Sequence, residues 1–245
     1  MVPPLSLHAW LRYDAIQRLL ARVDEARTLL EIGAGLGSVG VLLARRFEYV
    51  GLELDEVSYA AAAERFERLG VAARMVRGDL SALPGSERFD VVCAFEVLEH
   101  YDDDLGELRR WGERLRPGGW MMVSVPAGSH RFAAADERAG HFRRYNRGDL
   151  RSLFAEAGFR EPVIVTYGFP VGYLLEAARN QIARRQNGHA GLSPSARTAV
   201  SARWLQPGET LAPALAVTAA PFRLLQRPFG GSSLGTGHVA LARAA

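Results

Sequence analysis

Residues 30–38 read Leu30-Glu31-Ile32-Gly33-Ala34-Gly35-Leu36-Gly37-Ser38, an apolar run that passes through three glycines into a helical pattern. Glycine permits a tight turn here and lets a ligand approach the backbone closely. A helix that begins directly after such a turn presents free N–H groups at its N-terminus. This stretch therefore predicts a strand, a ligand-binding loop and a helix in direct succession.

Short apolar runs alternate with helical patterns on both sides of this loop. We expect strands at residues 28–32, 49–54, 73–76, 89–95, 120–125, 162–167 and 238–242. Helical patterns lie between them at residues 38–46, 57–69, 103–115 and 147–157, and a turn is expected at residues 116–119. Nearly continuous apolar strands are typical of a sheet covered by helices on both faces. The pattern predicts an α/β fold with a mostly parallel sheet.

The length of 245 residues suits a single domain, residues 1–245. Helical apolar periodicity with a capping serine predicts an N-terminal helical cap within residues 1–27. Residues 168–233 carry prolines and further helical stretches, and we expect a helical insertion there between the last two strands. A hydrophobic lid is the favoured role for this insertion. A homodimer interface or a membrane-surface contact also fits its amphipathic stretch at residues 173–185.

Composition excludes several classes of protein. Apolar residues make up 48% and charged residues 23%, which is typical of a globular chain and not of a disordered one. The single cysteine, Cys93, permits no intrachain disulfide and no CxxC metal clip, and no metal ligands are assigned. The sequence shows neither a membrane-spanning apolar run nor a signal peptide. We expect a soluble, cytoplasmic protein in which Cys93 is a buried core thiol.

The basic residues do not indicate a nucleic-acid partner. The sequence pI is 9.3, yet the formal net charge is only +3. All 30 basic side chains are arginines, and they are scattered in pairs rather than gathered in one tract. Arginines at helix ends and on the surface account for this pattern. No nucleic-acid partner is therefore expected.

Glu53 ends the next expected strand about 20 residues after the loop, where a carboxylate holds ribose hydroxyls in nucleotide-binding units. A dinucleotide fingerprint requires G-x-G-x-x-G, but Ser38 stands in place of the third glycine. Glu31 lies two residues before Gly33. Its carboxylate would repel a negatively charged pyrophosphate and would attract a ligand that carries an ammonium group. These features favour a nucleotide-like ligand other than NAD.

Five motifs in order over residues 28–126 resemble class I S-adenosylmethionine-dependent methyltransferases. They are the glycine loop, Glu53, Gly78-Asp79-Leu80, the stretch Phe89-Asp90-Val91-Val92 with Glu96-Val97-Leu98-Glu99-His100, and Leu115-Arg116-Pro117-Gly118-Gly119. The "EVLEH" form, together with residues 136–145, resembles the small-molecule group related to ubiquinone-biosynthesis O-methyltransferases. The resemblance implies a Rossmann-like sheet of seven strands, with the last strand antiparallel beside strand six.

The resemblance also implies S-adenosyl-L-methionine as cofactor and a set of residues that bind it. The glycine loop would hold the methionine moiety and Glu53 the ribose hydroxyls. Leu54 would pack on the adenine, and Asp79 would accept from the adenine amine. Arg12 would reach the methionine carboxylate from the N-terminal helix. The complete set is Arg12, Glu31, Gly33, Ala34, Gly35, Glu53, Leu54, Asp79, Leu80 and Phe95.

The candidate catalytic residues are His141 and Tyr145, in the polar cluster Gly140-His141-Phe142-Arg143-Arg144-Tyr145 over the open end of the sheet. Histidine is the usual general base near neutral pH. His100 and His130 are interpreted more simply as loop or cap residues. Arg143 and Arg144 are equally consistent with binding an anionic group of the substrate and with a solvated pair.

The sequence thus predicts an S-adenosylmethionine-dependent enzyme that methylates a small molecule, most simply on oxygen, in a metabolite or natural product. Methylation of nitrogen or carbon, or of a lipid at a membrane surface, is the first alternative. A nicotinamide-dependent oxidoreductase and a catalytically silent binding protein are alternatives of other classes.

Overall fold

In the computed structural model, which describes residues 3–185, 208 and 212–245, seven strands form one sheet in the order β3-β2-β1-β4-β5-β7-β6. In that order they are Arg74–Arg77, Glu48–Glu53, Thr28–Ile32, Phe89–Phe95, Leu115–Pro126, Gly237–Ala244 and Phe159–Tyr167. Neighbours pair in parallel, except that β7 is antiparallel to both β5 and β6. The predicted sheet with an antiparallel last strand is confirmed.

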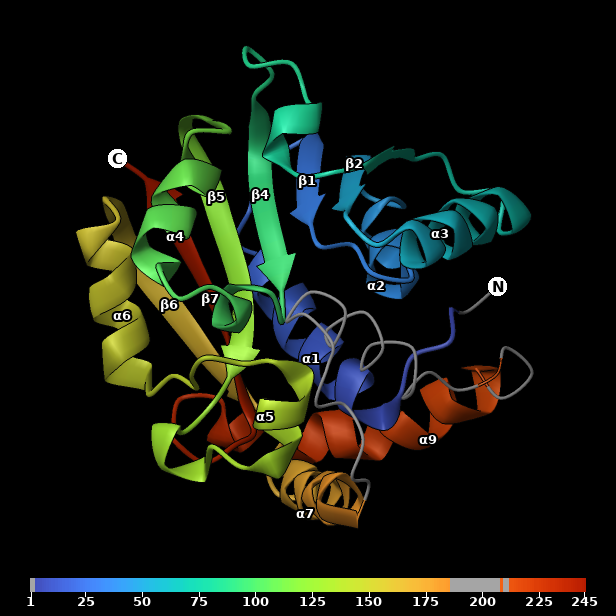
Figure 1. Ribbon diagram of the computed structural model, residues 1–245, viewed down its shortest axis with the longest axis vertical. Helices are drawn as coiled ribbons and strands as arrows, with labels where there is room; N and C mark the ends of the chain where they lie inside the picture. Colours follow the sequence, from blue (N-terminus) through green and yellow to red (C-terminus); the bar gives the residue numbers. More distant parts are fainter. Residues whose placement is uncertain (1–2, 186–207, 209–211) are drawn as a thin grey trace.

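Helices cover both faces of the sheet (Figure 1). One face packs against α1 (Leu7–Leu20), α2 (Ser38–Leu43), α3 (Glu56–Arg68) and α9 (Ala212–Leu225). The other face packs against α4 (Asp104–Gly112) and α6 (Arg147–Glu156). Along β4, Val91 and Cys93 face the first layer, whereas Val92 and Ala94 face the second. Burial on both faces explains the unbroken apolar run of this strand, and the expected burial of the Cys93 thiol is confirmed.

Most elements begin and end within a few residues of their expected bounds, and the exceptions have local causes. Ser6 caps α1 by accepting a hydrogen bond from the Ala9 N–H (3.3 Å), so the helix begins at Leu7. The turn expected at residues 116–119 lies inside β5 instead. It is an irregular part of that strand, because Gly118 has φ +70° and the pairing with β4 shifts register between Phe89 and Val91.

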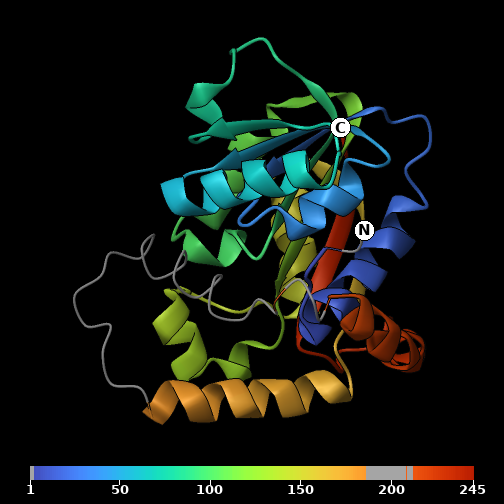
Figure 2. The ribbon, with the colours of Figure 1, turned by 90° about the vertical axis from the view of Figure 1, so that its right-hand side faces the viewer.

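Two helices lie beyond the carboxyl ends of β1, β4 and β5, namely α5 (Ala134–Ala139) and α7 (Val171–Arg185) (Figures 1 and 2). α7 and α9 both lie between β6 and β7 in the chain. Residues 186–207 and 209–211 of the predicted insertion lie outside the described residues. None of the helices described here combines the length and the hydrophobicity needed to cross a membrane.

Asp90 joins the start of β4 to the start of β1. Its Oδ2 accepts hydrogen bonds from the backbone N–H groups of Arg27 and Thr28, both at 2.9 Å, and from the Thr28 hydroxyl at 3.0 Å. Its Oδ1 lies 2.6 Å from the Arg116 guanidinium. Burial alone would raise the pKa of Asp90, but these hydrogen bonds outweigh it and lower the pKa to about 2.

We expect Asp90→Ala to lower the free energy of unfolding by about 1–2 kcal/mol at pH 7, since the side chain is partly exposed and its ion pair is screened. The folded-state pKa lies below that of the unfolded chain, so this contribution is present above about pH 4 and is lost as the pH falls toward 2. Urea unfolding of both proteins at pH 7 and pH 3 measures the difference. A difference that does not narrow at pH 3 would contradict this account.

Candidate active site

The glycine loop between β1 and α2 holds three left-handed glycines, with φ +70° at Gly33, +55° at Gly35 and +74° at Gly37. A Cβ at Gly33 would lie 2.6 Å from the Val97 side chain, so only glycine lets the segment after β4 approach this closely. A Cβ at Gly35 would meet nothing within 4 Å. The loop is therefore packed on one side and open above Gly35, where a ligand has room.

Glu53 connects this loop to the end of β2. Its carboxylate accepts hydrogen bonds from the N–H groups of Gly35 (2.7 Å) and Asp55 (2.9 Å), and the Ala34 N–H donates to the Leu52 carbonyl (2.8 Å). Burial raises the pKa of Glu53. Each carboxylate oxygen retains a further acceptor position, so a pair of ligand hydroxyls fits beside the open part of the loop.

The other residues expected to bind the cofactor lie along the same edge of the sheet. Leu54, directly after β2, is 62% exposed and offers apolar surface. Asp79 follows β3 and accepts hydrogen bonds from the Ser81 N–H (2.8 Å) and hydroxyl (2.6 Å), which lower its pKa. Leu80 and Phe95 are buried in the core, so only their backbone groups or a small part of their side chains face this edge.

Glu31 and Arg12 lie deeper than expected. Glu31 is 3% exposed and accepts a hydrogen bond from the Tyr49 hydroxyl (2.6 Å), behind the glycine loop. Burial raises the pKa of Glu31 to about 7, against the lowering effect of that hydrogen bond. Arg12 projects from α1, and its guanidinium lies 3.5 Å from Glu96, at the end of β4.

Glu96 is the polar centre of the edge beyond β4. It adopts a left-handed backbone, with φ +58°, and its carboxylate accepts hydrogen bonds from Ser124 (2.9 Å) and Tyr167 (3.2 Å). Burial alone would raise the pKa of Glu96, but the charges of Arg12 and His8 and the Ser124 hydroxyl bring the net shift downward. A strained backbone at a charged, partly buried residue is typical of a functional position.

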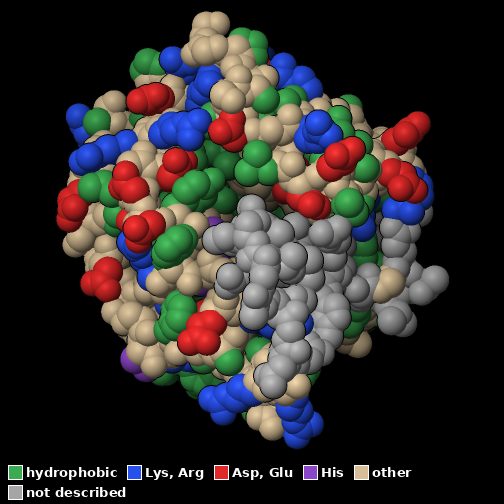
Figure 3. Space-filling model, viewed as in Figure 1, with side chains coloured by type: hydrophobic (Ala, Val, Ile, Leu, Met, Phe, Trp, Pro, Cys, Tyr) green, Lys and Arg blue, Asp and Glu red, His purple; other side chains and the backbone are tan. Residues whose placement is uncertain are grey.

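A polar pocket opens beside Glu96 at the carboxyl edge of the sheet. It is bounded by α1, the ends of β4 and β5, α5, α7 and the start of β7, and its cavity volume is about 30 Å³. Figure 3 shows a hollow near the centre of the molecule in the view of Figure 1, with hydrophobic side chains above it. The pocket is lined by His8, Glu96, Pro126, Asp136, His141, Arg144, Leu175, Glu176, Arg179 and Thr236.

His141 lies in this pocket and is held by Asp136. The His141 Nδ1 is 2.9 Å from the Asp136 Oδ1, and the His141 side chain is only 9% exposed. Burial would raise the pKa of Asp136, but hydrogen bonds from His141 and Arg144 lower it to about 2. An ionised carboxylate at Nδ1 fixes the imidazole hydrogen there and leaves a lone pair on Nε2.

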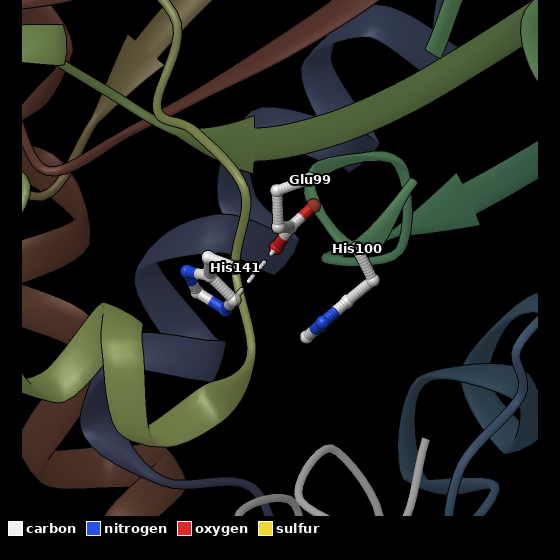
Figure 4. A group of neighbouring side chains, drawn as sticks. All are labelled: Glu99, His100 and His141. Carbon is white, nitrogen blue, oxygen red and sulfur yellow. Dashed lines mark ion pairs between the residues drawn. The ribbon is translucent and has the colours of Figure 1, made fainter. Parts of the chain in front are cut away.

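The Nε2 of His141 points toward Glu99 and His100, which follow β4 in the 3-10 helix η2 (Leu98–His100) (Figure 4). Glu99 Oε1 lies 3.9 Å from His141 Nε2, and the two imidazole rings meet edge to face at 4.7 Å. Burial raises the pKa of Glu99 well above its usual range and lowers the pKa of His100 to about 4. His100, expected to be a loop or cap residue, lies against the His141 ring in the structure.

Tyr145 does not share the pocket with His141. It is 4% exposed, and its hydroxyl donates to Asp104 (2.8 Å) on the opposite side of the segment, within the core that α4 and α6 cover. Burial raises the pKa of Tyr145 far above its usual value. The candidate catalytic role of Tyr145 is therefore replaced by a structural one, because its hydroxyl is already bound to Asp104 and its ring packs in that core.

The arginines beside Tyr145 are also paired within the protein. Arg143 contacts Asp102 and Asp104, both at 3.1 Å. Arg144 is buried between Asp136 and Glu176, both at 2.8 Å. These ion pairs leave neither guanidinium as a free anion site.

Sequence reasoning missed the charged residues that hold the pocket together. Both Asp136 and Glu96 lie in the motifs quoted above. Asp136 lies five residues before His141, and Glu96 directly follows a buried strand, so each position could have indicated a role in the site. Glu176, in α7, accepts hydrogen bonds from Arg131 (2.6 Å) and Arg144 (2.8 Å) and so links α7 to the α5 segment. No local pattern distinguishes it from the other acidic residues of an amphipathic helix.

The fold and the ligand-binding edge define a class I, Rossmann-like S-adenosylmethionine-dependent methyltransferase. A family described as methyltransferase domain matches residues 8–161, and the chain belongs to this family. Its cofactor is S-adenosyl-L-methionine. The open space above Gly35, the acceptor positions of Glu53 and the exposed Leu54 fit a nucleoside with two ribose hydroxyls.

Two known methyltransferases are similar to this chain in sequence over part of their length. A probable S-adenosylmethionine-dependent methyltransferase of Mycolicibacterium smegmatis is 32% identical over 154 residues, which cover 60% of this chain and 58% of that protein. A ubiquinone biosynthesis O-methyltransferase of Paramagnetospirillum magneticum is 36% identical over 104 residues, or 42% of each chain. The chain thus matches less than two thirds of the length of these two relatives.

Among solved structures, a possible histamine N-methyltransferase from Thermotoga maritima superimposes with a TM-score of 0.59 and 18% identity. The match covers 98% of this chain and 91% of the other. At this identity the likeness shows the fold alone and says nothing about the acceptor.

The buried Glu31 carboxyl gives the protein a measurable pH dependence. Its folded-state pKa of about 7 lies above that of an unfolded glutamate, so the folded state binds more protons and loses stability as the pH rises from about 4.5 to 7. Glu31→Gln removes this loss and keeps an acceptor for the Tyr49 hydroxyl. Between pH 4 and pH 8, we expect the variant to gain about 3 kcal/mol of unfolding free energy relative to wild type.

Urea titrations of both proteins at pH 4, 6 and 8 measure this gain. A stability difference that is constant across the three pH values would contradict the elevated pKa of Glu31.

Proposed function

We propose that this protein transfers the methyl group of S-adenosylmethionine to a hydroxyl oxygen of a small molecule. The observation that carries the proposal is the Asp136–His141 pair, 2.9 Å apart, in a pocket beside the end of β4. Ligands of open α/β sheets bind at this carboxyl edge. The distant similarity to a ubiquinone biosynthesis O-methyltransferase supports oxygen as the acceptor atom.

The cofactor side of the site uses the glycine loop and the strand ends. Glu53 would accept both ribose hydroxyl hydrogens, since a carboxylate has two oxygens. The backbone of Gly33, Ala34 and Gly35 would hold the methionine moiety. Asp79 would accept from the adenine amine and Leu54 would pack against the ring. Arg12, whose guanidinium lies 3.5 Å from Glu96, would supply a positive charge to the methionine carboxylate.

The acceptor side uses the polar pocket. S-adenosylmethionine supplies an activated methyl group, so the protein mainly positions the acceptor oxygen and favours its deprotonated form. Asp136 fixes the His141 hydrogen on Nδ1, and the Nε2 lone pair is the group that activates the acceptor hydroxyl. We infer that α7 and α1, which both contribute pocket residues, close the acceptor site from opposite sides and decide which molecules fit.

The N-terminal cap, the insertion and the single-domain organisation remain proposals of the same kind. Contacts of α1 and α7 with the pocket support a lid role for the insertion over a membrane-surface or dimer-interface role. A cytoplasmic location, the absence of a nucleic-acid partner and a possible homodimer stay predictions from the sequence.

The cofactor assignment is tested by calorimetric titration with S-adenosylhomocysteine. We expect Glu53→Gln to weaken binding at least about tenfold, because it removes one of the two acceptor oxygens and the charge that pair with the ribose. Glu56→Gln is the matched control, since Glu56 begins α3 and its carboxylate is 79% exposed. Equal affinities for the two variants would contradict the role of Glu53.

The acceptor assignment is tested by methyl transfer from labelled S-adenosylmethionine to a panel of phenols and alcohols. We expect His141→Asn to lower kcat by about 100-fold or more while S-adenosylhomocysteine affinity stays within twofold of wild type. His130→Asn, at an exposed position of η3 (Ser129–Arg131), is the control. Transfer only to amines, or unchanged kcat in His141→Asn, would overturn the proposed chemistry.

A further inference from the structure

Arg179, in α7, lines the acceptor pocket but has no part in the mechanism above. It follows Leu175 and Glu176 by one turn of the helix, and these two residues line the same pocket. Residues three or four positions apart share one face of a helix, so this face of α7 forms a wall of the pocket. The helix lies beyond the carboxyl ends of the strands (Figure 2), and Arg179 is partly buried there.

The carboxylates that line the pocket already have positively charged partners. Glu96 lies 3.5 Å from the Arg12 guanidinium. Asp136 and Glu176 both lie 2.8 Å from the guanidinium of Arg144. Each of these acidic groups is therefore compensated by an arginine other than Arg179.

The pocket consequently carries an excess of positive charge. Glu176 has a second arginine partner, Arg131, at 2.6 Å. In the part of the chain that the structure describes, Arg179 forms neither a hydrogen bond nor an ion pair. The pocket and its rim thus combine three carboxylates with four guanidinium groups, namely Glu96, Asp136 and Glu176 with Arg12, Arg131, Arg144 and Arg179. One positive charge remains for a ligand to balance.

His8, on the opposite wall of the pocket, responds to the charge of Arg179. It projects from α1, and its Nε2 lies 3.0 Å from the Thr236 hydroxyl. Burial and, next to it, the positive charge of Arg179 lower the pKa of His8 to about 3. The imidazole is therefore neutral at pH 7, and it leaves the positive charge in this part of the pocket to the guanidinium.

A solvated side chain is the simpler explanation for an arginine near the surface. It applies to Arg184 and Arg185, which are exposed in the last turn of α7, where positive charge also complements the helix dipole. Arg179 precedes that turn, is partly buried and lines the pocket. Its position and the excess of positive charge together favour a bound anion over solvent.

We propose that Arg179 binds a carboxylate of the acceptor, so that the substrate of this protein is a hydroxy acid. The cavity volume of about 30 Å³ holds about two water-sized groups, which matches the two oxygens of a carboxylate. A planar guanidinium donates to both oxygens at once. A single excess positive charge balances a monoanion, whereas the second negative charge of a phosphate would be repelled by the neighbouring carboxylates.

This inference rests on the proposed function and names the class of acceptor. Arg179 binds the acceptor and takes no part in the transfer of the methyl group. It is therefore a residue that determines specificity, and its loss is expected to change which molecules bind rather than to abolish the chemistry.

The test compares hydroxy acids with their own amides, which have nearly the same shape and lack the charge. Protein loaded with S-adenosylhomocysteine is titrated calorimetrically with lactate, with 2-, 3- and 4-hydroxybenzoate and with the matching amides. We expect at least one acid to bind wild type about tenfold or more tightly than its amide. Arg179→Gln should reduce this ratio to about twofold or less and leave the affinity for the amide unchanged.

Two further variants distinguish the charge of Arg179 from a structural role. Arg179→Lys should retain part of the preference for the acid, because lysine keeps the charge but lacks the planar pair of donors. Arg184→Gln is the matched control at an exposed position of the same helix and should bind as wild type does. Titration of every variant with S-adenosylhomocysteine, with affinities expected within about twofold of wild type, reports that the variant is folded.

No binding of any acid by wild type, equal affinities for each acid and its amide, or a preference that survives in Arg179→Gln would overturn the anion site. Displacement of the bound acid by an equal concentration of inorganic phosphate would overturn carboxylate as the class of anion. Methyl transfer separates this inference from the proposed function. A preference for acids that depends on Arg179, with transfer to amines and not to hydroxyls, overturns the proposed oxygen chemistry alone. Transfer to neutral alcohols with the same kcat/KM as to hydroxy acids overturns the acceptor class alone.

Discussion

The close approach of two loops at Gly33 is the constraint on which the active edge depends. Any side chain at Gly33 would collide with Val97, so the segments after β1 and after β4 lie in contact only because this residue is glycine. That contact places Glu96, Glu99 and His100 next to the glycine loop. The cofactor loop and the residues that face the acceptor are therefore positioned by a single steric requirement, and both belong to parallel strands that end at the same edge.

A second level of organisation comes from buried ion pairs rather than apolar packing. Arg144 joins Asp136 to Glu176, and Glu176 also pairs with Arg131. Buried ion pairs add little net stability compared with apolar side chains. Loss of one partner nevertheless destabilises the protein strongly, because the other charge is left buried and unpaired. Their effect here is geometric: they hold α7 against the segment that carries His141. The part of the chain expected to select the acceptor is thus tied to the residue expected to activate it.

Local sequence patterns were sufficient to predict the strands of the sheet and the glycine loop. The strands at Thr28–Ile32 and Phe89–Phe95 have the bounds that their apolar runs predict, because each is buried on both faces. Most residues proposed to bind the cofactor are also local, since they lie in strands or directly after them, whereas Arg12 lies in α1. The acceptor pocket is different: His8, His141, Glu176 and Thr236 meet from segments far apart in the sequence. Only the packing of α1, α7 and β7 brings them together, and Tyr145 shows that proximity in sequence to His141 does not place a side chain in the same pocket.

The Glu96-to-His100 segment shows why a motif that identifies the family does not by itself assign a role to each of its residues. Its two carboxylates are three residues apart, yet they have opposite environments. Glu96, at the left-handed turn, is compensated by Arg12 and by two hydroxyl donors, so its charge is stable where it lies. Glu99, one 3-10 turn later, is fully buried, and its carboxyl oxygens have no hydrogen-bond partner among the described residues. Burial disfavours the charged form of Glu99 and holds its pKa well above the usual range, whereas Arg12, His8 and the Ser124 hydroxyl lower the pKa of Glu96. The motif thus contains one carboxyl group that favours its charged form and one that favours its neutral form, and only the surrounding packing distinguishes them.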